Sequence, residues 1–208
     1  MLSVADEPAG RFRHQTGRRG WRSKIAARLD PTIVEQARNG DLHAFDSIVR
    51  SRMDAVYRLT YAIVGNEADA ADATQDAFVA AWRQIRSLRD AERLDAWLSQ
   101  IAVNAARMLA RGRRRRAVKE IEPIEGGSAD PWSVADDPAS RTADDARALG
   151  VALDRLSPDQ RSILALHHLD GRAVGDIATV LSIPIGTVKS RLFTARQALV
   201  RALADGDR

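Results

Sequence analysis

Apolar residues recur at spacings of three and four along most of this 208-residue chain, and no segment alternates apolar with polar residues as a strand does. The spacing is typical of amphipathic helices, whose period is 3.6 residues. Signals that start or stop a helix occur at Asp30-Pro31, Asn39-Gly40, Gly65-Asn66 and the segment 157–160, which reads Ser-Pro-Asp-Gln. The sequence therefore predicts an all-α fold.

Residues 30–116 are predicted to form a small bundle of four helices joined by short connections. Asp30 caps the first helix, Asp41 begins the second, Asn66 caps the third, and a polar bend at 87–92 precedes the fourth. The apolar stripe of the fourth helix is expected to be buried, and it consists of Leu94, Trp97, Leu98, Ile101, Ala105, Met108 and Leu109.

Charge is unevenly distributed although the net charge is only +4. Residues 1–29 hold seven cations against two acids and few apolar side chains, which predicts a disordered basic arm. An arginine cluster at 107–116 precedes residues 117–141, whose prolines, glycines and excess of acids predict a flexible acidic linker. Two interpretations of the arm stay open, a tail without a specific function and a segment that contacts DNA.

Residues 142–204 predict a second domain of four helices, followed by a short tail at 205–208. Within it, a helix from Val174 to Leu181, a turn at 182–184 and a helix from Ile185 to about Leu203 match a helix-turn-helix pattern. The pattern puts Val188, Leu192, Ala195 and Leu199 in the core and leaves cationic and hydroxyl side chains outward. The residues expected to contact duplex DNA are Arg172, Thr187, Lys189, Ser190, Arg191, Phe193, Thr194 and Arg196.

The composition excludes several classes of protein. The chain has no cysteine, and its four histidines are not spaced as metal ligands, so neither a disulfide framework nor a metal site is expected. No phosphate-binding glycine loop, nucleophile elbow or paired catalytic carboxylates occur, so the sequence predicts no enzyme, no cofactor and no small-molecule substrate. It also lacks a signal peptide and a membrane span, which predicts a cytoplasmic protein without membrane insertion.

Two further surfaces are suggested in the first domain. Aromatic side chains lie beside arginines around the bend, at Trp82, Arg89, Arg93 and Trp97, which is the combination that single-stranded DNA needs. The same aromatics at helical spacing are also compatible with an ordinary core. The outward face of the third helix carries Asp69, Asp72, Gln75, Asp76 and Val79, and it fits either a solvated or a protein-binding face.

The order of these motifs resembles that of the extracytoplasmic-function (ECF) group of sigma factors, the two-domain initiation factors of bacterial RNA polymerase. In the first domain the resemblance rests on Asn39-Gly40-Asp41, on 69–82 (DAADATQDAFVAAW) and on Trp97-Leu98 with 101–104. In the second domain it rests on 156–161 (LSPDQR), 176–178 (DIA) and 183–192 (IPIGTVKSRL).

The resemblance implies that the first domain binds the clamp helices of core RNA polymerase and melts the minus-ten promoter element. By motif position, Asp72, Gln75 and Asp76, with Val79 beside them, would meet the clamp helices. The residues expected at the everted minus-ten base and its strand are Arg89, Asp90, Arg93, Trp97, Asn104 and Arg107. The second domain would bind the minus-thirty-five element and the polymerase flap, and an anti-sigma factor is an expected partner.

Two other functions stay open on sequence alone. A helix-turn-helix regulator that binds a duplex operator without polymerase would explain residues 142–203, but it leaves the face from Asp72 to Trp82 unexplained. An interaction protein with an incidental basic tail is the third alternative.

Overall fold

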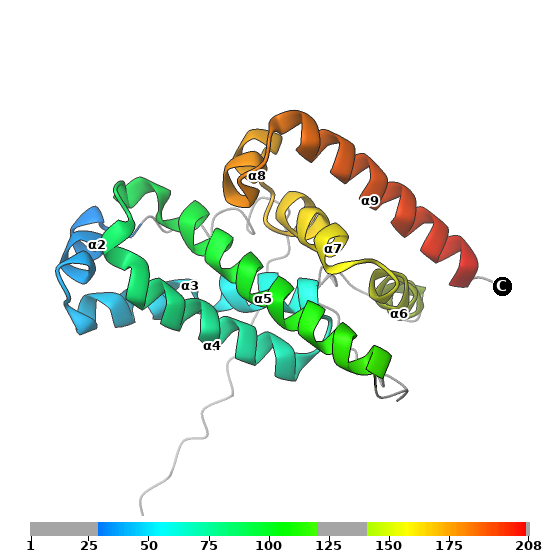
Figure 1. The fold of residues 1–208 in the computed structure, drawn as a ribbon, viewed down its shortest axis with the longest axis horizontal. Helices are drawn as coiled ribbons and strands as arrows, with labels where there is room; N and C mark the ends of the chain where they lie inside the picture. Colours follow the sequence, from blue (N-terminus) through cyan, green and yellow to red (C-terminus); the bar gives the residue numbers. More distant parts are fainter. Residues whose placement is uncertain (1–28, 120–140, 207–208) are drawn as a thin grey trace, which may run out of the picture.

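The computed structural model describes residues 29–119 and 141–206, and within these ranges the chain is helical without any strand (Figure 1). The all-α prediction is therefore confirmed. The predicted basic arm, most of the acidic linker and the end of the tail lie outside the described residues. The helices are α2 (Pro31–Arg38), α3 (Leu42–Val64), α4 (Glu67–Gln84), α5 (Leu94–Lys119), α6 (Arg141–Asp154), α7 (Pro158–Leu164), α8 (Val174–Leu181) and α9 (Ile185–Gly206), with short turns η1 (Ile85–Ser87), η2 (Ala91–Arg93) and η3 (Ala165–Leu169).

Local capping sets the helix starts, as the sequence predicts. The side chain of Asp30 accepts a hydrogen bond from the Thr32 backbone N–H at 2.9 Å, and Asp41 accepts one from that of His43 at 2.8 Å. Ser157 and Gln160 form a reciprocal capping box at the start of α7. Each of these bonds satisfies a backbone donor that the first turn of a helix leaves without an intrahelical partner.

Small side chains form the core where α4 packs on α5. The helices meet through buried alanines, which allow two backbones to approach closely, and the buried hydroxyls of Thr60 and Thr74 lie 2.8 Å apart nearby. The expected burial of Met108 is wrong, because its side chain is 67% exposed. The buried stripe of α5 runs instead through Leu98, Ala102 and Ala106, and Met108 projects from the other side of the helix.

The helix-turn-helix unit has a core of larger aliphatic side chains. Ile163, Leu166, Ile177 and Val188 are at most 1% exposed. Ser182 adopts a left-handed conformation, with φ of 52°, and this sharp turn ends α8 before α9 begins. The segment after α7 is a single π-helical turn, η3, rather than the continuous α-helix that the periodicity suggests.

The two helical units are in contact, and α5 lies beside α7 and α8 (Figure 1). A hydrophobic cluster continues from α3 through α5 to α9. Polar contacts across the boundary include Gln100 Nε2 to Ser182 Oγ at 2.9 Å and Arg111 Nη2 to Asp159 Oδ1 at 2.9 Å. Within the described ranges, none of the helices combines the length and the apolar character that crossing a bilayer would need.

Candidate nucleic-acid interface

The face of α9 follows the predicted period. Val188, Leu192 and Ala195 are buried against α7 and α8, which fixes the rotation of the helix about its own axis. The rest of the helix surface presents three cations, two hydroxyls and an aromatic ring to solvent. Its exposed residues are Lys189, Ser190, Arg191, Phe193, Thr194 and Arg196, while Thr187 is half-buried.

This mixture of side chains suits a DNA groove. Lys189, Arg191 and Arg196 supply donors for phosphate oxygens or for base edges, and Ser190 and Thr194 supply hydroxyls of either polarity. Phe193 is 66% exposed, an arrangement that leaves its ring free to meet an apolar group such as a thymine methyl. The contacts themselves stay a prediction.

Arg196 is held against the π-helical turn. Its Nη2 and Nε lie 3.3 and 3.4 Å from Nε2 of His168, and the two arginine atoms donate to a neutral imidazole. Partial burial lowers the pKa of His168, and the neighbouring His167 and Arg196 lower it further. The neutral ring thus positions Arg196 while its guanidinium stays exposed on the surface of α9.

Arg172 occupies a different place from the other predicted duplex contacts. Its Nη2 donates to the carbonyl of Asp95 at 3.1 Å and to Ser99 Oγ at 2.7 Å, both on α5 in the other unit. It also pairs with Asp170, and its side chain is only 16% exposed. In this conformation Arg172 joins the two units, and its predicted phosphate contact would require those bonds to be released.

The polar bend between α4 and α5 forms a pocket of about 400 Å³. Arg89, Asp90, Arg93 and Trp97 all line it, as the sequence predicts for a base-binding site, and Thr179 of α8 contributes to its wall. The Asp90 side chain caps η2 by accepting from the Glu92 N–H at 2.9 Å. The pocket thus joins an aromatic ring with hydrogen-bond donors and an acceptor at the start of a rigid helix.

Two of the predicted strand-contacting residues lie away from that pocket. Asn104 is exposed on α5 about two turns beyond Trp97 and does not line the pocket. The Nε atom of Arg107 lies 2.8 Å from Asp159 Oδ1 in the other unit, and its side chain is 14% exposed. Burial lowers the pKa of Arg107, and the Asp159 carboxylate opposes that shift. The structure therefore groups four of the six residues and separates these two.

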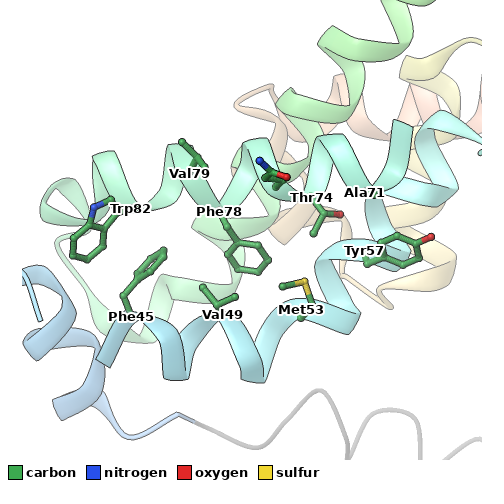
Figure 2. Close-up of a pocket in the computed structure, with 10 residues that line it drawn as sticks. Phe45, Val49, Met53, Tyr57, Ala71, Thr74, Phe78, Val79 and Trp82 are labelled. Carbon is green, nitrogen blue, oxygen red and sulfur yellow. The ribbon is translucent and has the colours of Figure 1, made fainter. Parts of the chain in front are cut away.

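The outward face of α4 borders an apolar groove against α3, shown in Figure 2. Asp72, Gln75 and Asp76 are exposed, and Val79 is 42% exposed. The groove has a volume of about 510 Å³. The residues that line it are Phe45, Val49, Met53, Tyr57, Ala71, Thr74, Gln75, Phe78, Val79 and Trp82.

This groove was not predicted from the sequence, because it forms only where α3 and α4 come together. The signal that could have found it is the width of the apolar stripe of α3. Ile48 and Val56 already fill the buried side of α3, so Phe45, Val49 and Met53 form a second row at i, i+4 and i+8. A helix with two apolar rows has more apolar surface than one core can cover.

Known families match both helical units. The family described as Sigma-70 region 2 matches residues 48–116, and the family described as Sigma-70, region 4 matches residues 146–199. The first match contains α4, the bend pocket and most of α5. The second contains the helix-turn-helix and the exposed face of α9.

Relatives match nearly the whole of this architecture. The RNA polymerase sigma-H factor of Pseudomonas aeruginosa is 32% identical over 180 residues, which are 84% of this chain and 93% of the relative. The ECF RNA polymerase sigma-E factor of Escherichia coli K12 is 32% identical over 177 residues, covering 82% and 92%. The ECF RNA polymerase sigma factor SigW of Bacillus subtilis is 29% identical over 180 residues, covering 83% and 95%.

Two solved structures share the fold. CnrH, in complex with the cytosolic domain of CnrY, is 28% identical with a TM-score of 0.58, over 86% of this chain and 99% of CnrH. The sigma factor RpoE of Bartonella quintana, in complex with the anti-sigma factor NepR, is 28% identical with a TM-score of 0.59, over 77% and 96%. The chain belongs to the sigma-70 family of RNA polymerase sigma factors, in its ECF group.

Proposed function

We propose that this sigma factor divides promoter recognition between three surfaces. The α4 face with its groove binds core RNA polymerase, the bend pocket opens the minus-ten element, and α9 binds the minus-thirty-five element as duplex. The observation that carries the proposal is that the three surfaces lie on different elements (Figure 1), namely the α3–α4 groove, the bend between α4 and α5, and the exposed face of α9. Both partners can then be bound at once.

The bend pocket has the composition needed to hold an unpaired base. Removing a base from the stack costs about a few kcal/mol, so the protein must replace the stacking and hydrogen bonds that the base loses. Trp97 supplies an aromatic surface, while Arg89 and Arg93 supply cations for the flanking phosphates. Asp90 supplies an acceptor for an exocyclic amino group.

Binding both promoter elements requires the two units to separate. The minus-ten and minus-thirty-five elements lie 25 base pairs apart, as their names state. This is about 85 Å of duplex at 3.4 Å per base pair. Here α8 contributes Thr179 to the bend pocket itself, and Arg172 bonds to Ser99. An arrangement with both DNA-binding surfaces side by side cannot span that distance, so promoter binding is accompanied by loss of the Arg172 contacts.

Partners follow from the same assignment. Both solved proteins with this fold are bound to another protein, which for RpoE is an anti-sigma factor, and we extend this to an anti-sigma factor for the present chain. The flap of core polymerase is the proposed partner of the helix-turn-helix unit, and the acidic linker would thread through the polymerase. We propose that the protein acts in the cytoplasm by binding, without a cofactor, a small-molecule substrate or catalysis of its own.

Run-off transcription with purified core polymerase tests the proposal. Core alone should give no promoter-specific transcript from a cognate template, and core with this chain should give one. A regulator that acts without polymerase would instead bind the duplex equally well with and without core and would initiate nothing. A protein that bound the promoter but gave no transcript with any matched core would contradict the assignment.

A further inference from the structure

The groove between α3 and α4 exposes several large apolar side chains on a side of the bundle that faces water. Met53 is 40% exposed at its centre and Val79 is 42% exposed along its edge. Phe45 and Trp82 close one end, with ring centroids 5.0 Å apart (Figure 2). A row of large apolar side chains in an open channel is typical of a surface that another segment covers.

Negative charge prevails along this groove. Six exposed charged side chains directly follow groove-lining residues in the sequence, and four of them are aspartates. One of the two cations, Arg50, is paired with Asp46 at 2.8 Å. The occupant expected on electrostatic grounds is therefore apolar and basic. The six residues are Asp46, Arg50, Asp54, Asp72, Asp76 and Arg83.

The described part of the chain begins beside the hydrophobic cluster on which the aromatic end of this groove rests. Leu29 is half-buried and packs against this cluster, as Phe45 and Trp82 also do. Residues 1–28 precede it directly, so they are covalently tethered beside the groove. A tethered segment binds at a high effective concentration, and even a weak contact is then well populated.

Residues 1–28 have the chemistry that the groove requires. They carry seven cations against two acids, and Trp21 and Ile25 are apolar residues at intervals of four before Leu29. From Phe45 to Tyr57 the groove follows twelve residues of α3, or about 18 Å at 1.5 Å per residue. About six extended residues cover that length at roughly 3.3 Å each, so residues 1–28 are several times longer than the groove requires.

We propose that residues 1–28 bind in the α3–α4 groove of the same molecule, with Trp21 and Ile25 on the apolar floor and the arginines beside the aspartates. The segment would cover Gln75 and Val79, to which the proposed function assigns polymerase binding. On that assignment the arm competes with core polymerase for one surface, and removing it strengthens polymerase binding. The docking of the arm does not itself depend on the polymerase assignment.

Methionine oxidation tests the docking directly in the full chain. Met53 lies in the groove, whereas Met108 is exposed on α5 outside it and serves as an internal reference. The full chain and a variant lacking residues 2–27 are treated with dilute hydrogen peroxide, and sulfoxide at each methionine is followed by peptide mass spectrometry. A second variant keeps the length but replaces Arg11, Arg13, Arg18, Arg19 and Arg22 with glutamine.

The expected result is slower oxidation of Met53 in the full chain, by at least about threefold relative to Met108, with protection lost in both variants. Equal Met53 to Met108 ratios in all three proteins would overturn the docking. Protection that persists in the truncated variant and grows with protein concentration would identify a second copy as the occupant, which also overturns it.

Binding to core polymerase then separates this proposal from the proposed function. Truncation should tighten core binding several-fold, and the five-glutamine variant should do the same with the chain length unchanged. If Met53 is protected in the full chain but core affinity is the same with and without the arm, the arm does occupy the groove and the polymerase assignment of that surface is wrong.

Discussion

The two helical units differ in the side chains at one helix contact and in the surfaces that they leave open. Where α4 meets α5, alanines fill the centre, and aromatic rings such as Phe45, Trp82 and Trp97 line open depressions at the surface. In the carboxy-terminal unit, Ile163 and Ile177 fill the centre, and the surface of α9 is mainly polar and cationic. The first surface suits protein and unstacked bases, and the second suits the phosphates and base edges of intact duplex.

The largest expected effect is on the free energy of unfolding, which a substitution in the carboxy-terminal core should lower more than one in the α3–α4 groove. Ile177→Ala removes a side chain that is fully buried, and we expect a loss of about 2–5 kcal/mol in the free energy of unfolding. Met53→Ala should cost less than about 1 kcal/mol, because the helices that form the groove leave that side chain 40% exposed. Urea denaturation followed by circular dichroism measures both. Equal losses would show that the groove is part of the core.

Charge reversal on α4 should have the next largest effect. Asp72→Arg with Asp76→Arg should weaken core polymerase binding at least about tenfold, or about 1.4 kcal/mol, because attraction turns into repulsion across the interface. Glu67→Arg, also exposed on α4 but outside the groove, serves as the control for charge reversal on this helix. Affinity is measured at near-physiological salt, since screening weakens rim charges. Unchanged affinity in the double variant would remove α4 from the interface.

Single cations on α9 should give a smaller and more specific effect. Lys189→Ala or Arg196→Ala should weaken duplex binding and flatten the slope of log K against log salt by about one unit, if each side chain neutralises one phosphate. Arg147→Ala, an exposed cation on α6, should leave the slope unchanged. A slope that stays the same in the α9 variants would contradict a phosphate contact.

The smallest expected effect is the pH dependence that His168 contributes to stability. Its lowered pKa means that the unfolded chain takes up the proton before the folded protein does. Stability therefore falls as the pH drops through about 6.5, the ordinary histidine value, and levels off below the folded pKa. His168→Gln should show a shallower fall over this range in thermal melts. Identical pH profiles would show that the ring is not held neutral.

Features that depend on neighbours in sequence could be predicted, and features that depend on distant residues could not. The caps at Asp30 and Asp41 are bonds between residues two or three apart, so the local sequence defines them. Arg172 contacts residues 73 and 77 positions away, and no spacing rule points to that pairing. The burial predicted for Met108 is wrong for a related reason, since the packing of α3 and α4 on α5 decides which side of α5 is buried.

The same distinction between neighbouring and distant residues applies to the candidate sites. The period of α9 was enough to find its exposed face, because one buried row fixes the rest of a helix. The bend pocket could be assembled from residues 87–97, which are close in sequence, whereas Asn104 and Arg107 lie outside it. The α3–α4 groove joins residues about 30 positions apart, so it became visible only in the fold.

Permanganate footprinting of unpaired thymines on a cognate promoter tests the division between the two units most directly. With holoenzyme at fixed occupancy, Arg89→Ala with Arg93→Ala should lower thymine reactivity at the minus-ten element, while duplex protection at the minus-thirty-five element persists. Lys189→Ala with Arg196→Ala should lower occupancy but leave reactivity per bound complex unchanged. Normal thymine reactivity in the Arg89 and Arg93 double variant would contradict the account, because the bend pocket would then have no part in opening the strands.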